Sequence, residues 1–282
     1  MPSLRSLYES ALRDVAFNHF NEIDIRLLLC SIQGLNSMSD FYLRSDEEIA
    51  DLQLFRSHFA RLLNGEPVQY IINKASFLGD DYYVDSRVLI PRMETEEVVR
   101  FAEKRIAEVF MNKDISIVDI GTGSGIIAIA LKKKYPYAKI LASDISQDAL
   151  DVAAINVAAH KASVDLLHGS ALDPLLSHGY KVDVLISNPP YITNVSEIDK
   201  NVSDYEPRGA LVDSSNQLIY QTILANYRYV AKYPFLIIFE IGYDMREKVE
   251  DLIKRFVPSA KWEIIKDINQ KDRILSILIE QE

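Results

Sequence analysis

A short segment of polar, proline and aromatic residues is the part of the sequence best suited to chemistry. The apolar run 182–187 predicts a buried strand. The residues that follow it are Asn188, Pro189, Pro190 and Tyr191. In open α/β sheets, ligands bind beyond the carboxyl ends of the strands. The sequence therefore places a candidate site at this segment.

The residue types in this segment suit recognition of a planar amino group. The two prolines lack N–H groups and have a fixed φ, so the backbone is stiff and its carbonyls are available as acceptors. Asn188 precedes a proline, which favours an extended backbone, and its side-chain oxygen is a further acceptor. Tyr191 offers a flat face on which an amide or a base can stack. The alternative is a simple strand-ending turn, because Asn-Pro is a common turn signal.

A glycine-rich turn lies upstream of this segment. Strand 115–120 leads into it and helix 126–134 follows, which is the opening of a Rossmann-like unit. Glycines permit positive φ and let a ligand approach the backbone at the helix N-terminus. The spacing is G-x-G-x-G, not G-x-G-x-x-G, which disfavours a dinucleotide. We predict that the cofactor-binding residues here are Gly121, Thr122, Gly123, Ser124 and Gly125.

The next two predicted strands supply further candidates. Strand 140–143 ends at Asp144, where a carboxylate can accept hydrogen bonds from ribose hydroxyls. The alternative is that Asp144 and Ser146 only cap the following helix. Strand 164–167 leads to Ser170 and Ala171, where we expect an adenine ring.

Alternating strands and helices continue to residue 256, and an antiparallel pair, 262–265 with 274–279, ends the chain. This order predicts an α/β fold with a seven-stranded, mostly parallel sheet and helices on both faces. Residues 1–75 have helical apolar spacing and predict a small N-terminal helical domain. We expect this domain to dock a substrate or partner; the alternative is that it only packs against the larger domain. Within it, Ser45 and Glu48 predict a capping box. Residues 76–93 predict a β-hairpin linker with a turn at 79–81, and 94–282 form the larger domain, where Thr95 is expected to cap a helix.

Composition narrows the function classes. The 282 residues are 48% hydrophobic with a net charge of -10, and the first 75 carry seven basic and ten acidic residues, a net of −3. This charge disfavours direct nucleic-acid binding.

Cys30 is the one cysteine and the five histidines are scattered, so neither an intramolecular disulfide nor a metal site is expected. No apolar run reaches 18 residues and no signal peptide is recognisable, so we expect a cytoplasmic protein, monomeric by default, with no membrane partner.

Together these motifs resemble the class I S-adenosylmethionine-dependent methyltransferases that act on nitrogen. The helical N-terminal region, the Ile90-Pro91-Arg92 segment, Glu206-Pro207 and Glu240-Ile241-Gly242 narrow the resemblance to the release factor glutamine methyltransferases, the HemK/PrmC family. The resemblance covers nearly the whole chain. Ser170 and Ala171 depart from it, because relatives often have an acidic and an aromatic residue there.

The resemblance implies methyl transfer to the side-chain nitrogen (N5) of the glutamine in the Gly-Gly-Gln motif of peptide chain release factors, which would be the partners. The cofactor would be S-adenosylmethionine, yielding S-adenosylhomocysteine without a metal, and Asn188 would also contact it. Asn188 and the Pro189 carbonyl would accept the two amide hydrogens, Pro190 would stiffen the loop, and Tyr191 would pack on the substrate.

Two alternative hypotheses for the function remain. A nucleic-acid methyltransferase acting on an exocyclic amine of adenine or guanine would use the same Asn-Pro-Pro-Tyr segment, but it needs a basic channel. A non-catalytic cofactor-binding protein would use the helical domain as a docking module. Methyl transfer to a release factor, to a nucleic acid or to neither would distinguish the three.

Overall fold

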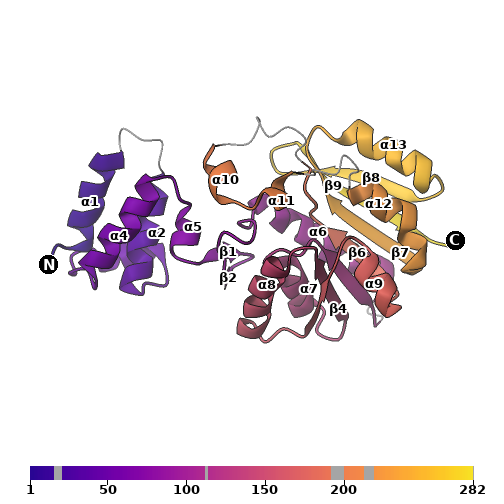
Figure 1. Ribbon diagram of the computed structural model, residues 1–282, viewed down its shortest axis with the longest axis horizontal. Coiled ribbons are helices and arrows are strands. Elements are labelled where there is room, and N and C mark those ends of the chain that lie inside the picture. The colour runs from indigo at the N-terminus through magenta and orange to yellow at the C-terminus, as the bar shows by residue number, and fades with distance from the viewer. Residues whose placement is uncertain (16–20, 112–113, 192–199, 213–218, 282) are drawn as a thin grey trace. The chain divides into compact units, whose positions relative to one another are not determined.

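The computed structural model describes residues 1–15, 21–111, 114–191, 200–212 and 219–281 (Figure 1). The chain forms two compact units, which we describe separately. A helical unit comprises Met1–Lys74 and Lys200–Tyr205, and an α/β unit comprises Ala75–Asp199 and Glu206–Glu282. No helix in the described ranges is both long and apolar enough to cross a membrane.

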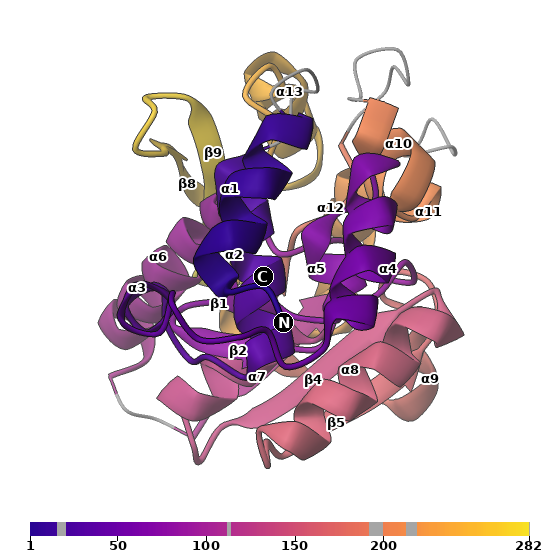
Figure 2. The same cartoon turned by 90° about the vertical axis from the view of Figure 1, so that its left-hand side faces the viewer.

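The helical unit is built from short amphipathic helices around one apolar core. Helix α2 packs against both α1 and α4 (Figure 2). Leu4, Ile25, Leu28 and Leu29 are fully buried at the centre of this core. The helices are α1 (Leu4–Val15), α2 (Glu22–Gln33), α3 (Met38–Leu43), α4 (Leu52–Leu63), α5 (Val68–Ile71) and α10 (Lys200–Tyr205).

The predicted capping box is wrong. Helix α4 begins after Asp51, whose side chain accepts from the Leu54 N–H at 2.8 Å. Ser45 instead donates to the Tyr42 carbonyl, and Glu48 forms an isolated β-bridge with Ser3. Segment 46–50 thus pairs with the start of the chain, a long-range contact that overrides the local capping signal.

The α/β unit opens with a hairpin of β1 (Ala75–Phe77) and β2 (Asp80–Tyr82). Its two-residue turn is Leu78-Gly79, with φ values of 52° and 84°. Positive φ at both positions matches the right-handed twist of a hairpin. The turn therefore lies one residue earlier than predicted, because Asp80 and Asp81 belong to the second strand.

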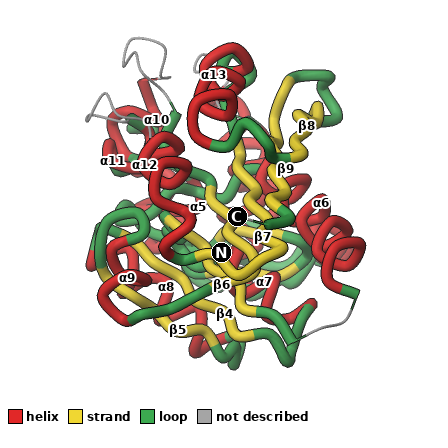
Figure 3. The backbone as a smooth tube through the Cα atoms, turned by 90° about the vertical axis from the view of Figure 1, so that its right-hand side faces the viewer, coloured by secondary structure: helices red, strands yellow, loops and turns green. Residues whose placement is uncertain are grey.

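The central sheet has the predicted seven strands in the order β5-β4-β3-β6-β7-β9-β8 (Figure 3). The first five are parallel, and β9 runs antiparallel to both β7 and β8. The strands are β3 (Ser116–Ile120), β4 (Lys139–Asp144), β5 (Val164–His168), β6 (Val182–Ser187), β7 (Ala231–Glu240), β8 (Lys261–Lys266) and β9 (Asp272–Ile279).

Alternate residues of each central strand enter separate cores on the two faces, as strand periodicity requires. In β7, Leu236 and Ile238 face the core beneath α6 (Met93–Phe110) and α7 (Ile126–Lys134), with α8 (Gln147–Ala159) beside α7. The intervening Phe235, Ile237 and Phe239 face the opposite core. That core is covered by α9 (Asp173–His178), α12 (Ile219–Asn226) and α13 (Arg246–Phe256); α11 (Arg208–Leu211) and the short 3₁₀ helix Tyr227–Tyr229 complete the unit.

From its apolar pattern, the sequence predicts a helix from about residue 216 to 232 and a strand over 235–241. Strand β7 instead begins at Ala231, four residues earlier than this prediction. The Val182 N–H donates to the Val230 carbonyl at 2.8 Å, and Ala231 is in register with Val182. Pairing with β6 therefore extends the strand backwards. The predicted helix start at 216 lies outside the described residues.

The sheet has a topological switch point between β3 and β6. From β3 the order runs outward through β4 and β5 on one side, and from β6 it runs through β7 on the other. Loops leaving two such strands diverge and open a crevice at their carboxyl ends. Ile120 and Ser187 are register partners, so the glycine turn and the Asn188 segment begin at the same point of the crevice.

Candidate active site

Strand register brings the predicted site residues together at one edge of the sheet. The last residues of β3, β4, β5, β6 and β7 lie close to a common line. The residues at or just beyond these ends are therefore neighbours despite their separation in sequence. They are Gly121, Asp144, Gly169, Asn188 and Glu240.

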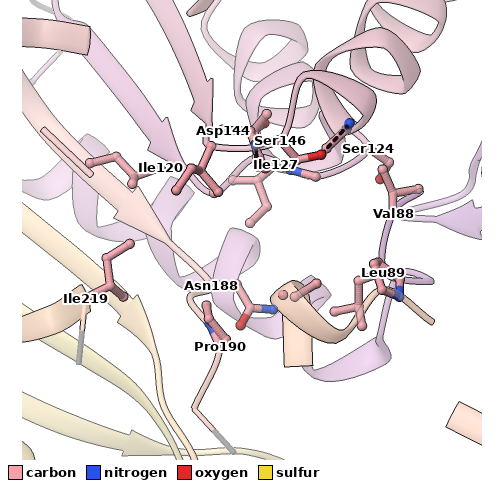
Figure 4. A pocket seen from close by; sticks show the side chains of 18 of the residues that line it. Val88, Leu89, Ile120, Ser124, Ile127, Asp144, Ser146, Asn188, Pro190 and Ile219 are labelled. Atoms are coloured by element: carbon pink, nitrogen blue, oxygen red, sulfur yellow. Dashed lines mark hydrogen bonds between the residues drawn. The ribbon is translucent and has the colours of Figure 1, made fainter. Parts of the chain in front are cut away.

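A pocket of about 560 Å³ opens at this edge. Its volume is in the range of small-molecule sites. Nine of the predicted residues line it: Gly121, Thr122, Gly123, Ser124, Asp144, Ser170, Ala171, Asn188 and Pro190. Figure 4 shows Asp144 and Ser146 above the space that Asn188 and Pro190 line from below. Gly125, Pro189 and Tyr191 do not line it.

The glycine turn gives the pocket a backbone wall. Gly121 and Gly123 have φ values of 72° and 55°, and a Cβ added to either would meet no atom within 4 Å. A ligand can therefore approach this backbone closely. Gly125 has a different role, because its added Cβ would lie 3.3 Å from the Ala153 Cβ. The third glycine lets α7 and α8 pack together.

Asp144 is held by the backbone around it. Its Oδ2 accepts from the Gly123 N–H and its Oδ1 from the Ser146 N–H, both at 2.9 Å. Burial raises the pKa of this carboxyl, and the N–H groups act against that rise. The N-cap of α8 is Ser146, whose hydroxyl accepts from the Ala149 N–H. Asp144 therefore braces the glycine turn and is not the N-cap of that helix.

Asn188 is linked by hydrogen bonds to Thr95 and, through Thr95, to Glu240, two residues from distant elements. Its Nδ2 donates to Thr95 Oγ1 at 3.2 Å, and Thr95 Oγ1 donates to Glu240 Oε2 at 2.8 Å. Thr95 and Glu240 are only 3% and 1% exposed. The prediction that Thr95 caps a helix is wrong: the N-cap position is Arg92, and Thr95 lies in the first turn of α6.

The electrostatics at Glu240 are unusual for a glutamate. Burial raises its pKa to about 7, while the Thr95 hydrogen bond and the nearby Arg273 guanidinium act in the opposite direction. Asp119, below the glycine turn, also has a pKa raised to about 7 by burial, with its Oδ2 accepting from Thr122 Oγ1 at 2.6 Å. Carboxyl groups of raised pKa therefore lie both at the glycine turn, which has Asp119 and Asp144, and behind Asn188, where Glu240 bonds to Thr95.

Another part of the wall joins segments 87–92 and 207–212. Arg92 donates to Glu206 Oε1 at 2.6 Å, and the Ile90 N–H donates to Glu206 Oε2 at 3.2 Å. Val88 and Leu89, on the right of the pocket in Figure 4, belong to the first segment. These lining residues were not predicted as site residues. Opposite charges at 92 and 206, each beside a proline, are the signal that could have indicated them.

Tyr191 packs beside the pocket. A Cβ added to Gly242 would lie 3.1 Å from Tyr191 Cδ2 and 3.3 Å from Met245 Cγ. Burial raises the pKa of the Tyr191 hydroxyl. The absence of a side chain at residue 242 therefore makes room for this ring, and stacking of Tyr191 on a substrate stays a prediction. Within the described ranges, no group of three or more histidine, cysteine, aspartate or glutamate side chains could hold a metal ion.

Comparison with known proteins extends over both units. The family model "PrmC N-terminal domain" matches residues 5–72, and "Methyltransferase small domain" matches 97–205. The release factor glutamine methyltransferase of Staphylococcus aureus is 39% identical over 84% of this chain and 86% of its own length. That of Chlorobaculum tepidum is 36% identical over 97% of each chain.

Similarity to solved structures concerns the fold alone. The hMettl16 catalytic domain, solved with a MAT2A 3′UTR hairpin, aligns with a TM-score of 0.53 over 79% of this chain and 93% of its own, at 12% identity. The predicted fold, a seven-stranded methyltransferase-type α/β sheet with an N-terminal helical region, is confirmed.

Proposed function

The chain belongs to the release factor glutamine methyltransferase family, and on this basis we propose that it methylates the N5 nitrogen of the glutamine in the Gly-Gly-Gln motif of peptide chain release factors. The observation that carries this proposal is the place of Asn188. Its carboxamide lines the same pocket as the glycine turn, at the switch point of the sheet. An amide-binding group and a cofactor-type turn thus share one cavity.

Membership of a methyltransferase family implies S-adenosylmethionine as the methyl donor. The residues fit such a ligand, since the open space above Gly121 and Gly123 lets its amino acid part lie against the backbone. Asp144 would accept from its ribose hydroxyls, and Ser170 and Ala171 would lie beside its adenine. When bound, it would supply an electrophilic methyl group on a sulfonium and leave as S-adenosylhomocysteine.

The Asn188 segment would prepare the glutamine nitrogen. An amide nitrogen is a weak nucleophile because its lone pair is delocalised. Asn188 Oδ1 and the Pro189 carbonyl would accept its two hydrogens, orient the lone pair and stabilise positive charge that develops as the N–C bond forms. Pro190 would hold the backbone rigid and Tyr191 would pack on the substrate. Holding the nitrogen next to the methyl group would supply much of the acceleration. As the N–C bond forms and the C–S bond breaks, the nitrogen would release one of its two protons to solvent.

Several further features belong to the same proposal. The helical unit, matched by the PrmC N-terminal model, would dock the release factor. No metal would take part, because methyl transfer from a sulfonium requires no Lewis acid. We propose a monomer that works in the cytoplasm, where release factors act, and that makes no direct contact with nucleic acid.

Mass spectrometry of an unmethylated release factor tests the proposal. After incubation with this protein and S-adenosylmethionine, we expect one added methyl on the Gly-Gly-Gln glutamine. A factor in which that glutamine is replaced by alanine should gain none. Methyl transfer to DNA or RNA in a parallel reaction, with an unmodified release factor, would contradict the proposal and favour the nucleic-acid reading.

A further inference from the structure

The Asn188 carboxamide has two ends of nearly equal shape and opposite hydrogen-bonding character. Its oxygen accepts, while its NH₂ group only donates. A substrate amide that presents two N–H groups would be bound by the oxygen and repelled by the NH₂ group. Under the proposed function, catalysis therefore depends on which end of the side chain faces the pocket.

The hydrogen bonds of Thr95 determine this orientation. A threonine hydroxyl has one proton to donate, and an ionised carboxylate can only accept. Thr95 Oγ1 lies 2.8 Å from Glu240 Oε2 and donates its one proton to that carboxylate. Thr95 Oγ1 can then only accept from Asn188, so the carboxamide must turn Nδ2 towards it, as the 3.2 Å contact shows. Oδ1 is left as the end that can accept from a ligand.

Both supporting residues are themselves rigidly held. The Thr95 N–H donates to the Arg92 carbonyl at the start of α6. Glu240 is the last residue of β7, and its carbonyl accepts from the Tyr220 hydroxyl at 2.7 Å. Asn188 and Glu240 end neighbouring strands, since Ser187 and Phe239 are register partners. A helix and two strands therefore converge on one carboxamide.

We propose that Thr95 and Glu240 are positioning residues that hold the Asn188 carboxamide with Oδ1 towards the acceptor nitrogen. This inference rests on the proposed function. Neither residue has to touch the reacting atoms. Asn188 makes the substrate contact, and Thr95 transmits the constraint from Glu240.

The arrangement depends on the ionisation of Glu240. A protonated Glu240 becomes a donor to Thr95, which frees the threonine proton to bond Asn188 Oδ1 and reverses the carboxamide. The charged or titratable groups around Glu240 are Arg273 from β9, Glu94 and Arg92 at the start of α6, and Tyr191. Since the pKa of Glu240 is raised to about 7, kcat should fall as pH falls below about 7.

Three substitutions test the proposal through kcat and KM on the release factor. Thr95→Val removes the hydroxyl at nearly constant volume, and we expect kcat to fall by about tenfold or more, as for other losses of orientation at a reacting centre. Thr95→Ser should restore most of it. Glu240→Gln has no titrating proton at this position, so its kcat should lose the decline at acidic pH. KM for S-adenosylmethionine should change little in all three.

Matched controls lie in the same unit, away from the pocket. Tyr135→Phe also removes one hydroxyl hydrogen bond, to the Glu103 carbonyl at 2.6 Å. Asp183→Asn also neutralises a carboxylate, at the opposite end of β6. Both should leave kcat and its pH profile unchanged. A Thr95→Val variant with wild-type kcat, or a Glu240→Gln variant with the wild-type acid limb, would overturn the proposal.

A substrate-free measurement separates this inference from the proposed function. In ¹⁵N NMR spectra, the Asn188 side-chain NH₂ signal, assigned by its loss in Asn188→Ala, should shift in Thr95→Val and not in Tyr135→Phe. An unshifted signal would contradict the orientation even in an active enzyme. A shifted signal in a protein that methylates no release factor would support the orientation and refute the proposed substrate.

Discussion

The two halves of the pocket are built in different ways. The glycine-turn half, residues 121–125 with Asp144, is held through backbone N–H groups, such as that of Gly123, which bonds to Asp144 across 21 positions. The Asn188 half consists of Asn188, Thr95 and Glu240. Its side-chain bonds span 93 and 145 positions. One half depends on backbone contacts between two successive strands, β3 and β4, whereas the other exists only when side chains from distant parts of the α/β unit have come together.

This difference predicts that the two halves have different roles in binding and catalysis. Backbone groups present a constant surface, which suits a cofactor that is the same in every turnover. Side chains locked by other side chains give a precise orientation, which suits a reacting atom. Damage to the glycine-turn half should therefore appear in cofactor affinity, and damage to the Asn188 half in the rate of the bound complex.

The largest effect is expected from Asn188→Ala. Removal of one preorganised hydrogen-bonding group at a reacting centre lowers kcat by about 10²- to 10³-fold. The dissociation constant for S-adenosylmethionine, measured by calorimetry, should change by less than about threefold, an energy below 1 kcal/mol. A large loss of affinity with an unchanged kcat would reverse the roles assigned to the two halves.

The second prediction concerns the buried carboxyls Asp119 and Glu240. The folded-state pKa values of Asp119 and Glu240, about 7, lie above the ordinary values of 3.8 and 4.5. The folded protein therefore binds more protons than the unfolded chain in this window, so its free energy of unfolding should fall as pH rises from about 4 to about 7. Each carboxyl contributes on the order of 3 kcal/mol to this fall.

Urea unfolding at pH 5, 6, 7 and 8 measures this slope. Asp119→Asn and Glu240→Gln should each reduce it, while Tyr135→Phe, which removes no carboxyl group, should not. Only Glu240→Gln should also change the pH profile of kcat, because the Asp119 carboxylate bonds to Thr122 in the glycine turn, whereas Glu240 bonds to Thr95. Equal effects of both variants on that profile would show that the halves are coupled.

The third prediction targets the glycine-turn half. Gly123→Ala introduces a side chain at a φ of 55°, a left-handed conformation that costs an L-residue roughly 1–2 kcal/mol. Relief of that strain would move the N–H that holds Asp144. We expect S-adenosylmethionine to bind about tenfold more weakly, with kcat at saturation largely retained.

Gly179→Ala is the control for this variant. Gly179 has a φ of 66°, equally open space around its added Cβ, and a place at the end of α9 outside the pocket lining. It should lose similar stability without losing affinity. An equal loss of affinity in both variants would attribute the effect to general destabilisation.

The same contrast explains what could be predicted from sequence. The seven strands, helix 126–134, the glycine turn and Asp144 follow from periodicity and from glycine spacing, which are local signals. Asn188 was found because prolines mark the end of its strand. These residues lie at or next to one edge of the sheet because parallel strands in register carry their carboxyl ends together.

Contacts between side chains that are far apart in sequence could not be predicted from these local signals. Thr95 has the sequence context of a helix cap, and only the fold shows that its hydroxyl meets Glu240. The same holds for the bond of Arg92 to Glu206, 114 positions apart. The capping-box prediction for Ser45 and Glu48 failed for the opposite reason. Its strong local signal is overridden by the pairing of Glu48 with Ser3. A local pattern cannot reveal a partner that tertiary packing alone selects.

The smallest effect is expected from Ser170→Asp, which should strengthen cofactor binding at the glycine-turn half and leave the Asn188 half unchanged. Ser170 is exposed at the pocket edge after β5, where we place the adenine of the cofactor. A carboxylate there could accept from the adenine amino group, and an exposed hydrogen bond to a charged group is worth at most about 1 kcal/mol in water. Calorimetry should therefore show a gain in affinity of up to about fivefold with kcat unchanged. Ser170→Asn offers a neutral acceptor of the same size, so a smaller gain is expected from it. A loss of affinity confined to Ser170→Asp would mean that repulsion from Asp144 outweighs the new hydrogen bond, and a loss in both variants would place the adenine elsewhere.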